Sequence, residues 1–450
     1  MSTLARPWSS LLSEPWLAAN RVLTCAVLQW RLRARARRLP YAREADSVLY
    51  VAASALPYHI SGYTTRTHEV IRALRAAGAN VHPLTRPGYP WDRSDRQCAA
   101  PGDEGVAETV VETVRYQHAS RPGNDRPVLQ YALQAAPVVA EIAARRRVAV
   151  VHAASNHVNA LPALLAARQL GLPFHYEMRG LWELTRISRM PQYERGQACK
   201  QGLQLEGLVA RHADRLFVIS EQLGRYAREH WGIAPERMSL LPNCVDPALF
   251  APADPAIVEA ATIGYAGSLI GYEGLDTLID AVDLLVRKGN PLSLTLIGDG
   301  EARAQLTAQV ERLRLGERIR FLGKIPPAAA RECLARCALV CIPRKPFKVC
   351  QIIPPIKLVE ALAMGKPVIV PDLPVFRDEL GASPPGWFFR AGDAADLARV
   401  IELALADRPA LAACGARARA YAVSQRCWRD FVGQALPSAD DEAQNVHARA

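Results

Sequence analysis

Several kinds of feature are missing from this chain of 450 residues, and each absence disfavours a class of protein. Its 10 cysteines form no Cys-x-x-Cys pair and no Cys/His spacing typical of a metal site, so we expect reduced, mostly buried thiols. No stretch approaches the roughly eighteen uninterrupted apolar residues of a membrane span. The motifs of RNA- and DNA-binding domains are also absent. A disulfide-stapled secreted domain, an integral membrane protein and a nucleic-acid-binding protein are therefore disfavoured, and a cytoplasmic location is expected.

The size and charge of the chain set the next bounds. A length of 450 residues exceeds what one hydrophobic core normally holds, so two domains of roughly 200 residues each are expected. Half of the residues are hydrophobic and 22% are charged, which is usual for a globular protein. The formal net charge of +11 predicts anionic partners, such as sugar nucleotides, phosphate-linked acceptors or an anionic membrane surface.

Apolar runs that read as buried strands alternate with helical patterns in both halves of the chain. The first half has such runs at residues 47–53 and 148–152, and the second half restarts with one at residues 262–266. This alternation predicts an α/β protein in which each domain is a parallel sheet covered by helices. We expect a basic N-terminal arm (1–46), two domains (47–253 and 254–436) and a disordered tail (437–450).

The N-terminal arm carries apolar residues at helical spacing followed by a run of arginines. The apolar part extends from Trp16 to Trp30, and the basic part comprises Arg31, Arg33, Arg35, Arg37 and Arg38. A signal peptide carries its positive charge before the apolar core, so this order disfavours one. Two interpretations remain open. The arm either lies on an anionic membrane surface, at the inner face of the plasma membrane, or packs as a helix on the protein's own surface.

The most informative stretch is residues 339–369. A buried strand ends in a basic loop, Pro354 and Pro355 open a helix, and Gly365 follows the end of that helix. Proline in the first turn and glycine just after the end are usual helix boundaries. The free N–H groups of the helix start face the loop that contains Arg344 and Lys348, which together favour a phosphate ligand.

The helix after this loop adds two charged residues on one face. Lys357 and Glu360 are three positions apart and therefore neighbours on the helix surface. A lysine that binds phosphate and a carboxylate that accepts hydrogen bonds from sugar hydroxyls suit a nucleoside diphosphate. We therefore predict a donor-binding site formed by Arg344, Lys348, Lys357 and Glu360.

Residues 357–368, with the sequence KLVEALAMGKPV, resemble the donor-site helix of the family 4 retaining glycosyltransferases of GT-B fold. The resemblance implies two Rossmann-like domains whose parallel sheets face each other across a cleft. It also implies that Glu360 binds the ribose of a nucleotide sugar. Many members carry a second glutamate eight residues earlier, at the donor sugar, where this chain has Ile352.

Two further segments resemble the family and depart from it. Residues 240–250 resemble the crossing between the domains, with Cys244 in place of the usual glycine. The loop at residues 267–274 resembles the diphosphate loop, which implies a close backbone contact at Gly267. Members often carry an arginine and a lysine in this loop, where this chain has Ser268 and Glu273. A glutamate there is unfavourable for a diphosphate unless it turns away, so the positive charge must come from the basic loop and helix.

The first loop supplies another candidate. Gly62 follows the first predicted strand and precedes a helix expected from about residue 67, and glycine in such a loop allows close approach to donor phosphates. The loop is not Gly-x-Gly-x-x-Gly, which disfavours a dehydrogenase. His59, Arg66 and His68 either line the cleft or are ordinary solvated residues.

A cluster of charges marks the end of a strand near residue 178. Glu177 and Arg179 stand where ligands bind in parallel sheets, beyond the carboxyl end of a strand. Many family members carry a histidine near this place, at the reacting sugar, so we predict Glu177 and Arg179 as the catalytic residues. Arginine cannot act as a general base, so it would stabilise phosphate or orient the sugar. If the two residues pair only with each other, they are structural.

The resemblance implies transfer of a hexose-type sugar from a nucleotide-sugar donor to a glycan or lipid-linked acceptor, with retention of configuration. It implies bacterial surface-polysaccharide or glycolipid assembly. No cofactor and no metal are expected, and the absence of an Asp-x-Asp motif agrees. Two alternatives stay open: a sugar-nucleotide epimerase of the same fold, and a degenerate, non-catalytic nucleotide-sugar-binding subunit suggested by Ile352, Ser268 and Glu273.

Overall fold

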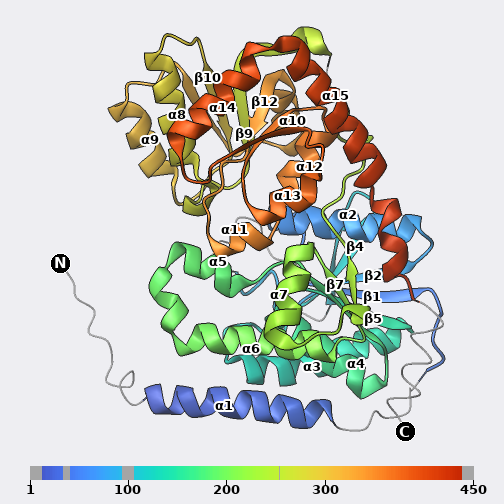
Figure 1. Cartoon of the computed structure of the whole chain (residues 1–450). Coiled ribbons are helices and arrows are strands. Elements are labelled where there is room, and N and C mark those ends of the chain that lie inside the picture. Colours follow the sequence, from blue (N-terminus) through green and yellow to red (C-terminus); the bar gives the residue numbers. More distant parts are fainter. Residues whose placement is uncertain (1–12, 34–40, 94–105, 253, 438–450) are drawn as a thin grey trace.

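The computed structural model describes residues 13–33, 41–93, 106–252 and 254–437, and its chain is built around two sheets (Figure 1). An eight-stranded sheet has the order β3-β4-β2-β1-β5-β6-β7-β8, and a six-stranded sheet has the order β11-β10-β9-β12-β13-β14. Strands of the first half form the first sheet and strands of the second half form the second. This arrangement confirms the predicted α/β class with two sheets of parallel strands.

The first sheet is parallel except at one edge. Its strands are β1 Ser47–Ala52, β2 Asn80–Thr85, β3 Val106–Val111, β4 Val114–Ala119, β5 Val150–Ala154, β6 Phe174–Met178, β7 Arg215–Val218 and β8 Met238–Leu240. The strands β3 and β4 form an antiparallel hairpin, which the sequence analysis did not predict. The residues of β3 are partly exposed and include polar side chains, so this edge strand lacks the continuous apolar run by which β1 and β5 were found.

Helices cover the first sheet on both sides. They are α2 Gly62–Ala76, α3 Val128–Arg145, α4 His157–Leu170, α5 Trp182–Arg189, α6 Gln197–His212 and α7 Glu221–Trp231. In Figure 1, α2 lies on the side of the sheet that faces the second domain, and it contacts α12 (Ile356–Ala363) of that domain. Helix α2 is therefore one of the elements that join the two domains.

The second sheet follows the same plan. Its strands are β9 Glu259–Ala266, β10 Ser293–Ile297, β11 Ile319–Gly323, β12 Cys337–Cys341, β13 Val368–Pro371 and β14 Gly386–Phe389. Its helices are α8 Leu275–Arg287, α9 Arg303–Arg312, α10 Pro327–Arg336, α11 Lys348–Ile352, α12 Ile356–Ala363, α13 Pro374–Leu380, α14 Ala394–Ala406 and α15 Arg408–Gln425. The predicted donor-site helix is α12, and a separate short helix, α11, precedes it in the basic loop.

The chain crosses between the two sheets twice. Val245 in the first crossing forms a bridge with Cys427 in the second, and Val245 N donates to Arg426 O at 2.9 Å. After α15, the short turns at Trp428–Asp430 and Val432–Ala435 pack against α2. The predicted boundary between the domains falls between β8 and β9. Residue 253, and the predicted tail (437–450) from residue 438 onward, lie outside the described residues.

The N-terminal arm contains helix α1 Ser13–Leu32, which contacts α3, α4 and α6 on the side of the first domain away from the second (Figure 1). Leu28 and Leu32 are buried in this contact, whereas the side chains of Val22 and Trp30 are 74% and 68% exposed. The helix therefore packs on the protein's own surface and also presents apolar residues outward. Arg35, Arg37 and Arg38 lie outside the described residues. Among the helices that the structure describes, none is long and apolar enough to span a bilayer.

Candidate active site between the two domains

A cavity of about 180 Å³ lies between the two domains. The first domain contributes Tyr63, Ser155, Arg179, Gly180, Leu181, Trp182 and Thr185, and the second contributes Tyr272, Arg344, Val349 and Ile353. A larger hollow of about 520 Å³, near Arg121 and Arg126, is lined by residues of the first domain alone. We place the candidate site at the interdomain cavity because two of the predicted site residues, Arg179 and Arg344, face each other across it.

The second domain brings Arg344 and Lys357 together on one buried carboxylate. Arg344 Nη2 lies 2.8 Å from Glu273 Oε1, and Lys357 Nζ lies 2.8 Å from Glu273 Oε2. Burial opposes the ionisation of Glu273, but the two cations outweigh it and lower the pKa of this carboxyl to about 2. Glu273 does not turn away from the expected phosphate site, as the sequence analysis required; it faces both cations.

Gly267 lies directly beside the ammonium group of Lys357. A Cβ at this position would stand 2.5 Å from Lys357 Nζ, and the φ of Gly267 is +151°. Any larger residue would therefore displace the lysine as well as strain the backbone. The structure thus places Gly267 beside Lys357, while the expected contact of Gly267 with phosphate stays a prediction.

Gly62 faces the start of α12 from the other domain. A Cβ on Gly62 would lie 3.2 Å from Ile356 Cγ2, one residue before Lys357. The expected helix start near residue 67 was wrong, because Gly62 is already the first residue of α2 and not a loop residue. Ser61 and Thr64 form a capping box that begins the helix five residues earlier. The N-terminal turn of α2 therefore points toward α12.

Glu360 and Lys348 differ in burial and in their position relative to the cavity. Glu360 is half-buried on α12, and its carboxylate accepts no hydrogen bond from the described residues. Burial raises the pKa of Glu360 to about 7, against the opposing charges of Lys357 and Arg331. Lys348 is exposed at the first residue of α11 and is not among the described residues that line the cavity. The donor-binding roles of both residues stay predictions.

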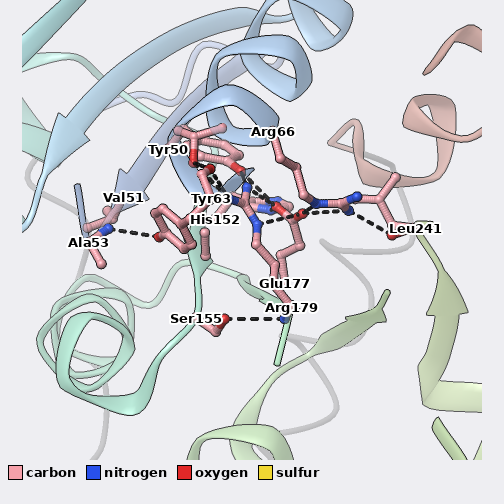
Figure 2. A network of polar contacts seen from close by, with 12 residues as sticks. Tyr50, Val51, Ala53, Tyr63, Arg66, His152, Ser155, Glu177, Arg179 and Leu241 are labelled. Atoms are coloured by element: carbon pink, nitrogen blue, oxygen red, sulfur yellow. Dashed lines mark hydrogen bonds and ion pairs between the residues drawn. The ribbon is translucent and has the colours of Figure 1, made fainter. Parts of the chain in front are cut away.

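In the first domain, Glu177 is enclosed by donors (Figure 2). Its side chain is 1% exposed, Arg179 Nε donates to Oε1 at 2.9 Å, and Tyr50 Oη donates to Oε2 at 2.7 Å. Arg66 Nε also donates to Oε1 at 2.9 Å. Arg179 lines the cavity and Glu177 does not. Glu177 therefore acts on any ligand only through Arg179 in this arrangement, and the catalytic assignment of the pair stays a prediction.

Arg66 is a buried residue that neither sequence interpretation described. Its guanidinium donates to Leu241 O at 2.7 Å and to Pro242 O at 2.6 Å, in the first crossing between the domains. The same group lies 5.1 Å from the ring centroid of Trp428, just after the second crossing. Arg66 thus joins Glu177 to both crossings. A sequence alone does not reveal this, since even the hydrogen-bond partners of Arg66 are up to 177 residues away.

The position that many family members fill with a second glutamate is packed between the domains. Ile352 is 3% exposed, and its carbonyl oxygen accepts a hydrogen bond of 2.5 Å from Ser220 Oγ at the start of α7. At the opening between the domains, Arg189 of α5 forms a two-point ion pair with Glu301. These contacts join the two domains around the cavity. Within the described residues, no group of three or more His, Cys, Asp or Glu side chains is arranged to hold a metal ion.

Two family models match the chain, one in each half. The model described as Glycosyl transferase 4-like domain matches residues 61–244, and the model described as Glycosyl transferases group 1 matches residues 252–421. The two matches together contain Arg66, Arg179, Glu273, Arg344 and Lys357. Both walls of the candidate site therefore belong to the matched residues.

Curated relatives match over part of the chain. A 2-deoxystreptamine glucosyltransferase from Streptomyces kanamyceticus is 25% identical over 215 residues, which is 45% of this chain and 54% of the relative. A phosphatidyl-myo-inositol mannosyltransferase from Mycobacterium leprae is 30% identical over 164 residues, which is 36% of this chain and 42% of the relative. The chain thus spans about half or less of the length of these relatives.

Solved structures of the same fold cover most of the chain. A sucrose-phosphate synthase from Thermosynechococcus elongatus has a TM-score of 0.71 and 18% identity, and the superposition covers 90% of this chain and 100% of that one. The Anabaena protein HepE, solved in complex with UDP, has a TM-score of 0.63 and 18% identity, covering 88% and 100%. At this level of identity the likeness concerns the fold.

Proposed function

This chain belongs to the family 4 type of glycosyltransferases with the GT-B fold, and from that premise we propose that it transfers a hexose-type sugar from a nucleotide-sugar donor. The acceptor in this proposal is a glycan or a lipid-linked molecule, the configuration is retained, and no metal ion takes part. The observation that carries the proposal is the meeting of Arg344 and Lys357 beside the interdomain cavity, opposite Arg179.

The chemistry of sugar transfer explains why such a site is useful. The transition state resembles an oxocarbenium ion, and negative charge grows on the departing diphosphate. Arg344, Lys357 and the N-terminal turn of α12 supply fixed positive charge and N–H donors at that place. Arg179, held by Glu177, would orient the sugar or stabilise phosphate from the opposite wall. Closing of the two domains would exclude water and orient the acceptor hydroxyl.

The base and sugar of the donor are proposed from the neighbours. HepE was solved in complex with UDP and in complex with UDP-glucose, so a uridine donor is the first to test. In this proposal Glu360 accepts hydrogen bonds from the ribose, which is supported by its half-buried carboxylate having no hydrogen-bond partner among the described residues. The acceptor class draws on the relative that is a phosphatidyl-myo-inositol mannosyltransferase.

An association with an anionic membrane is part of the proposal. Helix α1 presents Val22, Leu23 and Trp30 to solvent, and Arg31 and Arg33 are exposed at its end. Apolar side chains next to arginines suit the interface of an anionic bilayer. Flotation with vesicles of anionic lipid, and with neutral vesicles as the control, tests this. Trp30→Glu is expected to abolish the binding; unchanged flotation of that variant contradicts it.

The donor site is tested by nucleotide binding. Thermal unfolding with UDP, GDP, ADP and CDP is compared for the wild type, Lys357→Ala and Glu360→Ala. A ligand at about a hundred times its Kd stabilises the native protein by roughly 2.7 kcal/mol, and both variants should lose this effect. Lys288→Ala is the matched control, since Lys288 follows the end of α8 and forms an exposed ion pair with Glu402. Equal stabilisation of all variants would place the nucleotide elsewhere.

Turnover separates the enzyme from its alternatives. Release of nucleoside diphosphate from the nucleotide sugar, measured with and without a glycan or lipid acceptor and in the presence of EDTA, tests transfer and metal independence together. A change of the sugar without acceptor would indicate an epimerase. Binding without any turnover would favour a non-catalytic subunit, which the burial of Ile352 and the pairing of Glu273 with both cations support.

A further inference from the structure

Glu273 already pairs with both cations that are expected to bind the donor phosphates. Its Oε1 accepts from Arg344 Nε and Nη2 at 3.2 and 2.8 Å, and its Oε2 accepts from Lys357 Nζ at 2.8 Å. The residue is 3% exposed, so these contacts are shielded from water. Each cation therefore has an anionic partner before any ligand arrives.

The backbone delivers this carboxylate to the site and holds it there. Gly274, next to Glu273, has a φ of +74°, and a Cβ on it would stand 1.9 Å from Pro343 O. Lys345 N donates to Tyr272 O at 3.0 Å. The turn at Gly271–Glu273 is thus packed against the loop that carries Arg344. The main chain of this turn is therefore held against the Arg344 loop, which leaves the side chain of Glu273 as the part that would leave the cations.

The net positive charge of the three side chains is too small to balance a diphosphate. One carboxylate against two cations leaves one net positive charge, and a pKa of about 2 keeps Glu273 ionised throughout the physiological range. Phosphate oxygens within hydrogen-bond distance of Arg344 or Lys357 would lie close to the carboxylate of Glu273. Like charges repel strongly in a buried site. The carboxylate and the diphosphate therefore compete for the same donors.

We propose that Glu273 is a built-in competitor of the donor, and that a nucleoside diphosphate binds by displacing the Glu273 carboxylate from Arg344 and Lys357. This inference rests on the proposed function, because it presupposes a diphosphate at these cations. It makes Glu273 a residue that sets donor affinity: the carboxylate keeps both buried cations paired when the site is empty and weakens the binding of the nucleotide product after transfer.

The opposite role, in which Glu273 stays in place and positions the cations, predicts the opposite effect of removing its charge. Calorimetric titration with UDP, and with pyrophosphate as a probe without base or ribose, separates the two. Glu273→Gln is expected to bind UDP about tenfold tighter than the wild type, because the cations lose their resident counter-ion. Asp276→Asn is the matched control: it removes one negative charge from the start of α8, three residues after Glu273, where Asp276 pairs with Lys345 at a partly exposed position. Its affinity should change by less than about twofold.

The outcomes are distinct. Equal or weaker binding of UDP by a cooperatively folded Glu273→Gln, with binding lost in Lys357→Ala, overturns the inference and leaves the proposed function standing. If Glu273→Gln does not fold, Glu273→Asp decides, since it withdraws the same charge from the cations: tighter binding supports displacement and weaker binding overturns it. Equal binding by the wild type and Lys357→Ala, or no binding of UDP and pyrophosphate by any variant, overturns both the inference and the proposed donor site.

Discussion

Each domain places one buried glutamate between two cations at the interdomain cavity, and the two clusters differ in what the cations do next. In the first domain, Arg66 and Arg179 hold Glu177, and their remaining donors go to carbonyl and hydroxyl oxygens of the protein. In the second domain, Arg344 and Lys357 hold Glu273 with one further bond each, to Ile353 O and to Tyr265 Oη. The first cluster is saturated by the protein, whereas the second keeps donors for a ligand.

The two clusters show that the same residue types can serve a structural purpose in one place and suit ligand binding in another. A buried charge is tolerated when it is paired and its other hydrogen-bonding groups are satisfied. The Glu177 cluster meets this condition by itself and fastens β6, α2 and both crossings together. The Glu273 cluster meets it only in part, which suits a site that exchanges a resident carboxylate for phosphate.

The largest expected effect comes from breaking each cluster in turn. Glu177→Gln should lower the free energy of unfolding by about 3 to 5 kcal/mol, because two buried arginines lose their shared partner. Pyrophosphate should not restore this loss, since the remaining donors of both arginines are bonded to oxygens of the protein. Glu273→Gln should also be destabilised, but pyrophosphate should restore it. Urea denaturation with and without pyrophosphate measures both; rescue of Glu177→Gln would contradict the distinction.

A smaller effect is expected at Gly267, where only the second cluster is disturbed. Gly267→Ala places a methyl group 2.5 Å from the position of Lys357 Nζ and strains a φ of +151°. We expect a loss of about 1 kcal/mol in stability and a larger loss, about tenfold or more, in nucleotide affinity. Gly289→Ala is the control, because it has a φ of +85° and nothing within 4 Å of the added Cβ. Equal losses of affinity in both variants would contradict the role of Gly267.

The pH dependence of nucleotide binding gives a further test of the second domain. Glu360, whose pKa burial raises to about 7, accepts stronger hydrogen bonds when ionised, so nucleotide affinity should rise by up to about tenfold from pH 6 to 8. Glu360→Gln should remove this part of the slope, and the difference between the two proteins cancels the titration of the nucleotide itself. An identical slope in both proteins would exclude a contact between Glu360 and the ligand.

The same group affects the stability of the free protein. Its folded pKa of about 7 lies above the ordinary value of 4.5, so the folded state holds the proton more tightly than the unfolded chain. Stability should therefore fall as the pH rises from about 4.5 to 7 and level off above that. Buried Glu379, also with a pKa of about 7, contributes in the same direction, so the comparison with Glu360→Gln isolates one group.

The smallest effect is expected at the exposed edge of the cleft. Arg189 and Glu301 form an ion pair between the domains, but both side chains are 46% exposed. Glu301→Gln should change the free energy of unfolding by less than about 1 kcal/mol and leave nucleotide affinity unchanged. A calorimetric titration that detects a loss comparable with that of Gly267→Ala would show that this pair, and not the buried clusters, holds the domains in their binding arrangement.

Much of the fold was predictable because local patterns carry it. The apolar runs identified β1, β5 and β9, and Pro355 and Gly365 bracketed α12 to within one or two residues. The edge hairpin β3–β4 was missed because β3 is partly exposed and has no continuous apolar run. The start of α2 was missed because its capping box lies in a segment that reads as a loop.

Three residues of the candidate site could be singled out from the sequence, but the ion pairs that they form could not. Arg179, Arg344 and Lys357 were singled out by residue type and by their place at a strand end or helix start. Glu273 was recognised as unusual, but its partners were not predicted. Arg66 was left between two interpretations, a residue lining the cleft and a solvated residue. Charge at a position is visible in a sequence; which opposite charge it meets is decided by contacts between distant segments.

The sequence by itself determined the alternation of strands and helices, the two-domain plan and the likeness of residues 357–368 to a donor-site helix, because these depend on neighbours within a few positions. Only the tertiary structure decided that Glu273 meets Arg344 across 71 residues and Lys357 across 84, and that Arg66 meets Glu177 across 111. The physical reason is that ion pairs act through space over a few ångströms, so their partners are chosen by the packing of the sheets and helices that carry them.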